Sequence, residues 1–226
     1  MKNLYADSRV SFLQACALLV VSVCVIVLRY PPFLLQPRMW AEESMYYETF
    51  FSNPSILDGF DSVVYPAYYL LISRIVGLLA SFVDPANAAL VTTLCGLIVL
   101  LIPLIIIIFG RSMYWSTMHQ KIILSAFLIF SCSTGEIWMN STNVGFIMSV
   151  VTFLILIDEN PGNYYKKSLY MLLLFFAILT GPISLLMSPF FLYRFLQKKE
   201  PVYLIYCSLF LILGLFQISY FLVSHN

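Results

Sequence analysis

The segment Pro66–Phe82 constrains the topology of this chain more than any other part of it. Seven other apolar stretches have no charge at their centres, whereas this one carries Arg74 in its middle. An arginine at the centre of an isolated spanning helix costs about 2.5–3.5 kcal/mol. Ser73, Gly77 and Ser81 fall on the same helical face as Arg74, a pattern typical of a helix in the membrane interface. We therefore predict that this segment lies on the outer face of a membrane.

The rest of the chain has the composition of a membrane protein. Its 226 residues are 61% hydrophobic and 10% charged, whereas a soluble domain has about 25% charged residues. We predict one all-α domain over residues 1–226, a polytopic membrane helical bundle of about seven transmembrane helices. The predicted spans are Val10–Leu28, Ala86–Phe109, Lys121–Ser133, Thr142–Ile157, Ser168–Thr180, Ile183–Phe195 and Val202–Val223.

The basic residues decide the orientation. With Pro66–Phe82 outside, nine of the twelve lysines and arginines fall on the inner side. If that segment spanned the membrane, seven of these nine would move outside. The inner set is Lys2, Arg9, Arg111, Lys121, Lys166, Lys167, Arg194, Lys198 and Lys199, and the outer set is Arg29, Arg38 and Arg74. The sequence thus predicts a cytoplasmic N-terminus, an uncleaved signal anchor as the first span, and a juxtamembrane helical first outer loop over residues 30–85.

Two of the predicted spans are short. Ser168–Thr180 and Ile183–Phe195 meet at Gly181-Pro182. At a rise of about 1.5 Å per residue each reaches only about 20 Å, less than the hydrocarbon thickness. The pattern fits either a tight hairpin or one long kinked helix.

Several function classes lack their sequence signatures. The chain has no P-loop, no GxSxG, no HExxH and no Gly-rich dinucleotide motif. Its five cysteines fit neither a zinc site nor a disulfide framework. A net charge of +1 gives no indication of nucleic-acid binding. We expect no nucleic-acid partner; no cofactor is indicated, and the use of a divalent metal stays open.

An acidic pair opens the outer loop. Glu42 and Glu43 follow Arg38 and Trp40 just outside the first span. A carboxylate there suits general-base chemistry on a hydroxyl or amine, because partial burial and a like-charged neighbour raise its pKa. The simpler alternative is that both are solvated charges on an amphipathic helix.

A second polar stretch, residues 133–143, joins the third and fourth predicted spans. Glu136 is placed to face the outer loop, Trp138 to stack on a sugar ring, and Asn140 and Asn143 to bind hydroxyl groups. The alternative is a polar turn with an interfacial tryptophan.

Two further features complete the predicted pocket. The Gly181-Pro182 break is expected either to form the pocket floor or to serve only as a structural turn, because such a break needs protein or a wet cavity around it. Arg74 and Arg38 are the cations suited to a phosphate, since the guanidinium is a rigid multi-donor fork. For Arg74 the alternative is an ion pair with a nearby carboxylate.

These motifs resemble those of the C-type (GT-C) membrane glycosyltransferases. Glu42-Glu43-Ser44-Met45-Tyr46 is similar to the Asp-Glu-x-x-Tyr element of protein O-mannosyltransferases and aminoarabinose transferases. Tyr65-Pro66-Ala67-Tyr68-Tyr69 resembles their Pro-Pro-Leu-Tyr element. The stretches Gly135–Asn143 and Thr180–Pro189 resemble bacterial integral membrane proteins assigned to the same superfamily.

The resemblance implies a function. It implies a seven-helix module in a bacterial inner membrane, an isoprenoid-phosphate-linked sugar as donor, and Glu42 at the acceptor. Two departures stand out: Glu42 replaces the family's Asp, and the chain stops after the seventh span, where relatives continue. The alternatives are a non-catalytic protein that binds or flips lipid-linked sugars, or an accessory subunit with a partner membrane subunit. A small-solute transporter ranks last, because no internal repeat is visible.

Overall fold

The computed structural model describes residues 10–53, 55–62, 64, 68–110, 112–131, 139–158 and 164–224. Every element assigned in this part of the chain is a helix, so the all-α prediction is confirmed there. The helices pack around a core of Leu, Ile, Val and Met side chains, while many other large apolar side chains stay exposed on the outside. An apolar outer surface is what a hydrocarbon environment requires.

Three described helices are long and apolar enough to cross a membrane: α1 (Phe12–Arg29), α6 (Pro85–Phe109) and α11 (Pro201–Ser224). Four others are shorter, with 11 to 16 residues: α7 (Met118–Ser131), α8 (Val144–Ile157), α9 (Tyr164–Leu179) and α10 (Ser188–Lys198). A helix of about fourteen residues reaches about 21 Å, less than the roughly 30 Å of hydrocarbon. Seven complete spans therefore stay a prediction.

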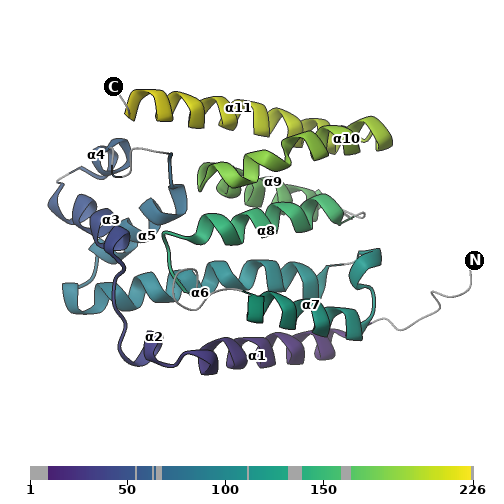
Figure 1. Ribbon diagram of the computed structural model, residues 1–226, viewed down its shortest axis with the longest axis horizontal. Helices are drawn as coiled ribbons and strands as arrows, with labels where there is room; N and C mark the ends of the chain where they lie inside the picture. The colour runs from purple at the N-terminus through teal and green to yellow at the C-terminus, as the bar shows by residue number, and fades with distance from the viewer. Residues whose placement is uncertain are drawn as a thin grey trace, which may run out of the picture.

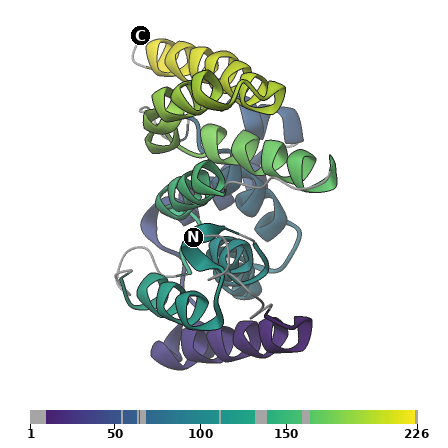
Figure 2. The same ribbon diagram turned by 90° about the vertical axis from the view of Figure 1, so that its right-hand side faces the viewer.

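The long and short helices run back and forth between two ends of the molecule. Figure 1 shows α1, α6, α7, α8, α9, α10 and α11 following one another in alternating directions. In both views α1 and α11 lie at opposite edges, with α6 and α8 between them (Figures 1 and 2). Each connection between consecutive helices therefore falls alternately at one end or the other.

The first loop stays at one end, which we call the loop end. It contains α2 (Pro32–Leu35), α3 (Ala41–Ser52), α4 (Ile56–Asp61) and α5 (Leu71–Ser81), all on the left-hand side of Figure 1. Helix α5 has 11 residues, too few to span a membrane. This arrangement agrees with a first loop that leaves and re-enters the bundle on the same side.

The polar face of α5 differs from the sequence-based expectation. A helix in the interface should turn its polar stripe to water, but Ser73, Arg74 and Gly77 are all buried. The reason is that α3 packs directly on this face. At Gly77 a Cβ atom would lie only 2.9 Å from the backbone of Tyr46, so the absence of a side chain allows the two helices to touch.

The short segment over residues 168–195 forms a hairpin. Helix α9 ends at Leu179, Gly181 adopts φ +157°, and the 3₁₀ helix η2 (Pro182–Met187) leads into α10. The helix after Pro182 runs back toward the other end of the molecule (Figure 1). The kinked-helix alternative is therefore wrong, because a glycine with positive φ followed by proline stops an α-helix.

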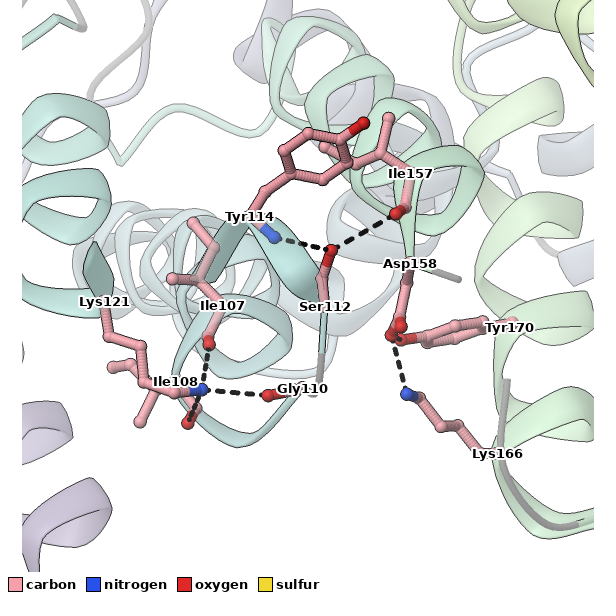
Figure 3. Close-up of polar contacts among 10 residues, drawn as sticks. All are labelled: Ile107, Ile108, Gly110, Ser112, Tyr114, Lys121, Ile157, Asp158, Lys166 and Tyr170. Carbon is pink, nitrogen blue, oxygen red and sulfur yellow. Dashed lines mark hydrogen bonds and ion pairs between the residues drawn. The ribbon is translucent and has the colours of Figure 1, made fainter. Parts of the chain in front are cut away.

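At the end opposite the loop end, polar side chains contact the ends of several helices (Figure 3). Lys121 donates from Nζ to the carbonyls of Ile107, Ile108 and Gly110 at 2.8, 2.8 and 2.9 Å. Carbonyls at the end of a helix have no intrahelical donor. The ammonium therefore caps α6, and its positive charge interacts favourably with the negative end of the helix dipole.

A second contact in Figure 3 joins α8 to α9. Asp158 ends α8, and its carboxylate accepts from Lys166 Nζ at 2.6 Å and from Tyr170 Oη at 2.5 Å. Nearby, Ser112 Oγ donates to the carbonyl of Ile157 at 3.3 Å, just before the 3₁₀ helix η1 (Met113–Trp115). The Ser112 contact satisfies a carbonyl at the end of α8, and the Asp158 contacts join α8 to α9. We assign both a structural role.

Candidate functional site

The loop end holds a short segment, residues 139–143, in an unusual conformation. Met139 has φ 50°, which is uncommon for a residue with a side chain. Asn140 Oδ1 accepts from Thr142 N at 2.7 Å and from Thr142 Oγ1 at 2.6 Å. Residues held in sparsely populated conformations occur preferentially at active sites and ligand clamps, so this segment is the natural starting point for a site.

A glycine in α6 makes room for this segment. A Cβ atom at Gly96 would lie 2.4 Å from the carbonyl carbon of Met139 and 2.8 Å from Asn140 N. Real Cβ atoms do not approach backbone so closely. The backbone of residues 139 and 140 therefore lies directly on α6, and any larger residue at position 96 would displace it.

Glu43 holds the same segment from the first loop. Its Oε1 accepts from Ser141 N at 2.7 Å and from Ser141 Oγ at 2.8 Å, and its Oε2 accepts from Trp40 N at 3.0 Å. Only 2% of the Glu43 surface is exposed. Burial raises the pKa of the Glu43 carboxyl, and the hydrogen bonds from Trp40, Ser141 and Thr92 offset part of that rise. Glu43 thus both caps α3 and fastens α3 to the entrance of α8.

Helix α5 completes this junction. Ser73 Oγ donates to the carbonyl of Ser141 at 2.7 Å. Ser141 is therefore bound through its amide and hydroxyl to α3 and through its carbonyl to α5. Three separate chain segments meet at this one residue, so its position depends on all of them.

A small pocket opens beside the segment. Its lining includes Tyr68 from the first loop, Thr142 and Asn143, and the break at Gly181-Pro182. Its volume is about 30 Å³, room for one water molecule and not for a sugar ring. The predicted floor at the Gly-Pro break and the predicted binding residue Asn143 thus line the same pocket.

Two glycines explain why the hairpin reaches this pocket. A Cβ atom at Gly145 would lie 3.0 Å from the carbonyl oxygen of Thr180, and the position of a Cβ at Gly181 is 3.8 Å from Gly145 Cα. The start of α8 and the α9–η2 turn are therefore in backbone contact. Thr180 Oγ1 also accepts from Ile72 N at 3.4 Å, which joins the turn to α5.

Arg74 lies apart from this pocket and is fully enclosed. Its guanidinium donates to the carbonyls of Gly59 and Ser62 at 2.9 and 2.7 Å, and to Tyr220 Oη at 3.0 Å. It also lies 4.4 Å from the Tyr69 ring centre. No carboxylate of the described chain forms an ion pair with it, and Nε has no hydrogen-bond partner there. Arg74 therefore ties α4 to α5 and α11.

The last helix holds the first loop by a second contact. Gln217 Oε1 accepts from Tyr69 N at 2.9 Å, and Gln217 Nε2 donates to the carbonyls of Tyr69 and Ile178 at 3.0 and 2.9 Å. Our sequence reasoning missed Gln217 and Tyr220. A signal was present for Gln217, because an amide in the middle of an apolar spanning helix marks a required polar contact.

Of the remaining candidates near the start of α3, two are exposed and one is half-buried. Arg38 and Glu42 are exposed, and the Arg38 guanidinium lies 5.2 Å from the Trp40 ring centre. Trp40 is half-buried, and its indole N–H has no partner in the part of the chain that the structure describes. The acidic pair is therefore divided: Glu43 points into the protein, and Glu42 points to the surface.

Two predicted binding residues, Glu136 and Trp138, lie outside the described residues. Of the others, Glu43 and Asn140 meet at the 139–143 segment, Asn143 lines the pocket next to it, and Arg74 does not join them. Among the described residues no group of three or more His, Cys, Asp or Glu side chains is arranged to hold a metal ion. No protein family model, curated protein or solved structure matches this chain.

Proposed function

We propose that this protein is a membrane glycosyltransferase of the C-type kind, which moves a sugar from an isoprenoid-phosphate donor to an acceptor on the outer face. The observation that carries the proposal is that Glu43 is buried whereas its neighbour Glu42 is exposed. Glu43 is buried and fixes the start of α3, so the neighbouring Glu42 is presented at the surface from a rigid element. A general base needs such a fixed position.

The groups around Glu42 suit this chemistry. Glu42 would accept the proton of the acceptor hydroxyl, the oxygen would attack the anomeric carbon, and the lipid phosphate would leave with the bonding electrons. Arg38 is exposed and lies at the same end of α3, so it is better placed than Arg74 to meet that phosphate. The guanidinium of Arg74 already donates to two carbonyls and a tyrosine.

Glu43, Asn140 and Asn143 take other parts in this proposal. Glu43 and Asn140 set the conformation of residues 139–143. The described pocket is too small for a sugar ring, so Asn143 would bind the sugar at the edge of the pocket, with the ring outside it. Glu136 and Trp138 are expected to complete the sugar site.

A transfer assay with the purified full-length chain tests the proposal. A labelled isoprenoid-phosphate sugar is supplied in vesicles, and Glu42→Gln is compared with Glu48→Gln, an exposed acid on the same helix. Loss of a general base lowers the rate roughly 10²–10⁴-fold, so Glu42→Gln should lose transfer while Glu48→Gln keeps it. Equal transfer by both variants would rule out the assigned base.

The second candidate is a non-catalytic protein that binds or flips lipid-linked sugars, or an accessory subunit of a partner membrane protein. The specific observation in its favour is the size of the described pocket, about 30 Å³, which leaves no space for a sugar. Donor binding without transfer, unchanged in Glu42→Gln, would support this second candidate.

A further inference from the structure

A groove between η2, α10 and α11 is lined by none of the residues of the candidate site. Its volume is about 460 Å³, within the roughly 300–1,000 Å³ range of ligand pockets. The lining is almost wholly apolar: Leu185, Ser188, Pro189, Leu192, Cys207, Phe210, Leu211, Gly214, Leu215 and Ile218. We call it the α10–α11 groove.

The groove owes its depth to one residue. Gly214 is buried at its base, where a Cβ atom would lie 3.3 Å from Leu185 Cδ2. Its rim is open, since Leu211 and Leu215 are 66% and 57% exposed. Helix α11, which forms one wall of this groove, is long enough to span a membrane. An apolar groove there does not hold water, and the acyl chains of the surrounding lipid fit it.

A basic cluster lies at one end of the groove. Leu192 and Cys207 line that end, and Lys198 and Lys199 follow Leu192 by six and seven residues. At a rise of about 1.5 Å per residue, Lys198 at the end of α10 lies about 9 Å beyond Leu192, and Lys199 follows it directly. Arg194 lies between Leu192 and Lys198, and Glu200 is the one acidic residue in the turn to α11. The turn therefore carries a net positive charge on the side that the charge distribution assigns to the cytoplasm.

We propose that the α10–α11 groove binds one acyl chain of an anionic phospholipid from the inner leaflet, with the headgroup at Lys198 and Lys199. The apolar wall selects the chain, and the two ammonium groups select a negative headgroup. Basic residues next to a crevice between transmembrane helices on the cytoplasmic side are the arrangement that binds anionic lipids. This inference is independent of sugar transfer.

Fluorescence quenching by brominated lipids tests the proposal in vesicles that contain the full-length protein. Leu211→Trp places a reporter in the groove, and Ile212→Trp places one on the adjacent, 63% exposed surface outside it. Each variant is compared with the unmodified chain, first with dibromo-acyl phosphatidylglycerol and then with dibromo-acyl phosphatidylcholine at equal mole fraction. Both substitutions exchange one exposed apolar residue for another, so folding is preserved.

We expect the anionic lipid to quench the groove reporter at a mole fraction at least about fivefold lower than the zwitterionic lipid, because one basic residue near an anionic lipid has about this effect and the proposed site has two. The Ile212→Trp reporter should respond equally to both lipids. Equal quenching by both lipids at Leu211→Trp would overturn the proposal. A preference for the anionic lipid at both positions would also overturn it, because that result indicates general enrichment around the protein.

The headgroup assignment has its own control. The double substitution Lys198→Gln and Lys199→Gln should reduce the preference at the groove reporter to less than twofold. Lys167→Gln removes a charge at the same end of the bundle, on α9, and should leave the preference intact. If the double variant keeps the full preference, the headgroup does not lie at these two lysines and the proposal fails.

Discussion

Replacing Glu43 separates its structural role from that of Glu42. In Glu43→Gln the amide oxygen can keep both contacts with Ser141, which are 2.7 and 2.8 Å long. Its NH₂ group then faces the Trp40 N–H, so the 3.0 Å bond is lost and one donor stays unsatisfied. A buried donor without a partner costs about 1–3 kcal/mol, and we expect the free energy of unfolding to fall by that amount.

Glu43→Ala should cost more. Trp40 N and the two donors of Ser141 then lose the acceptor that Glu43 provides, and α3 loses part of its capping. Thr92 Oγ1 also loses its contact with Glu43 but keeps the carbonyl of Ala89. We expect about 4 kcal/mol. For a chain of this length about 1 kcal/mol corresponds to roughly 2–4 °C in Tm, so the variant should unfold at least about 8 °C lower.

Thermal unfolding of the detergent-solubilised protein measures this series, with Glu42→Gln as the matched control. Glu42 is exposed, and an exposed substitution should change stability by less than about 0.5 kcal/mol. Hydrogen exchange should also show faster exchange at residues 139–143 in Glu43→Ala than in the unmodified chain. The reasoning fails if Glu43→Ala unfolds within about 2 °C of the unmodified protein, or if Glu42→Gln is equally destabilised.

The remaining predictions concern pH and the opposite end of the bundle. Because burial raises the pKa of Glu43 above its ordinary value of 4.5, the folded state holds the proton to higher pH than the unfolded state. The stability that this raised pKa contributes is therefore complete below pH 4.5 and is lost as the pH rises through the folded-state pKa of Glu43. Glu43→Gln should flatten this part of a curve of Tm against pH. An unchanged slope would refute the assignment of this pH dependence to Glu43. Lys121→Met leaves the carbonyls at the end of α6 without their donor, so it should cost about 3 kcal/mol in the same unfolding assay, whereas Lys167→Met should cost less than about 0.5 kcal/mol. Similar losses in the two lysine variants would show that the buried cap does not stabilise α6.

The first loop shows what a local sequence pattern can predict and what it cannot. The central Arg74 and the charge distribution predicted that Pro66–Phe82 would not cross a membrane, and the helix described in that segment is the 11-residue α5. The same pattern could not predict what Arg74 touches. Its partners Gly59 and Tyr220 are 15 and 146 residues away, and local periodicity carries no information about such distant contacts.

The acidic pair shows the same division. The sequence alone allows Glu42 and Glu43 to be either a general-base pair or solvated charges on an amphipathic helix, and both lie in the first turn of α3, which begins at Ala41. Which glutamate is buried depends on the rotation of α3 about its axis, and that rotation is set by packing against α5 and residues 139–143. Glu43 therefore holds the segment, and Glu42 stays exposed.

By itself the sequence determined the helical, membrane-type composition, the predicted distribution of basic residues, and the break at Gly181-Pro182. These properties depend on residue type and on spacing within one or two helical turns. Only the tertiary structure decided that Ser141 joins three segments, that Gln217 holds Tyr69, and that Gly214 opens a groove. Each of these depends on which helix faces meet, and that choice is made by the packing of the whole chain.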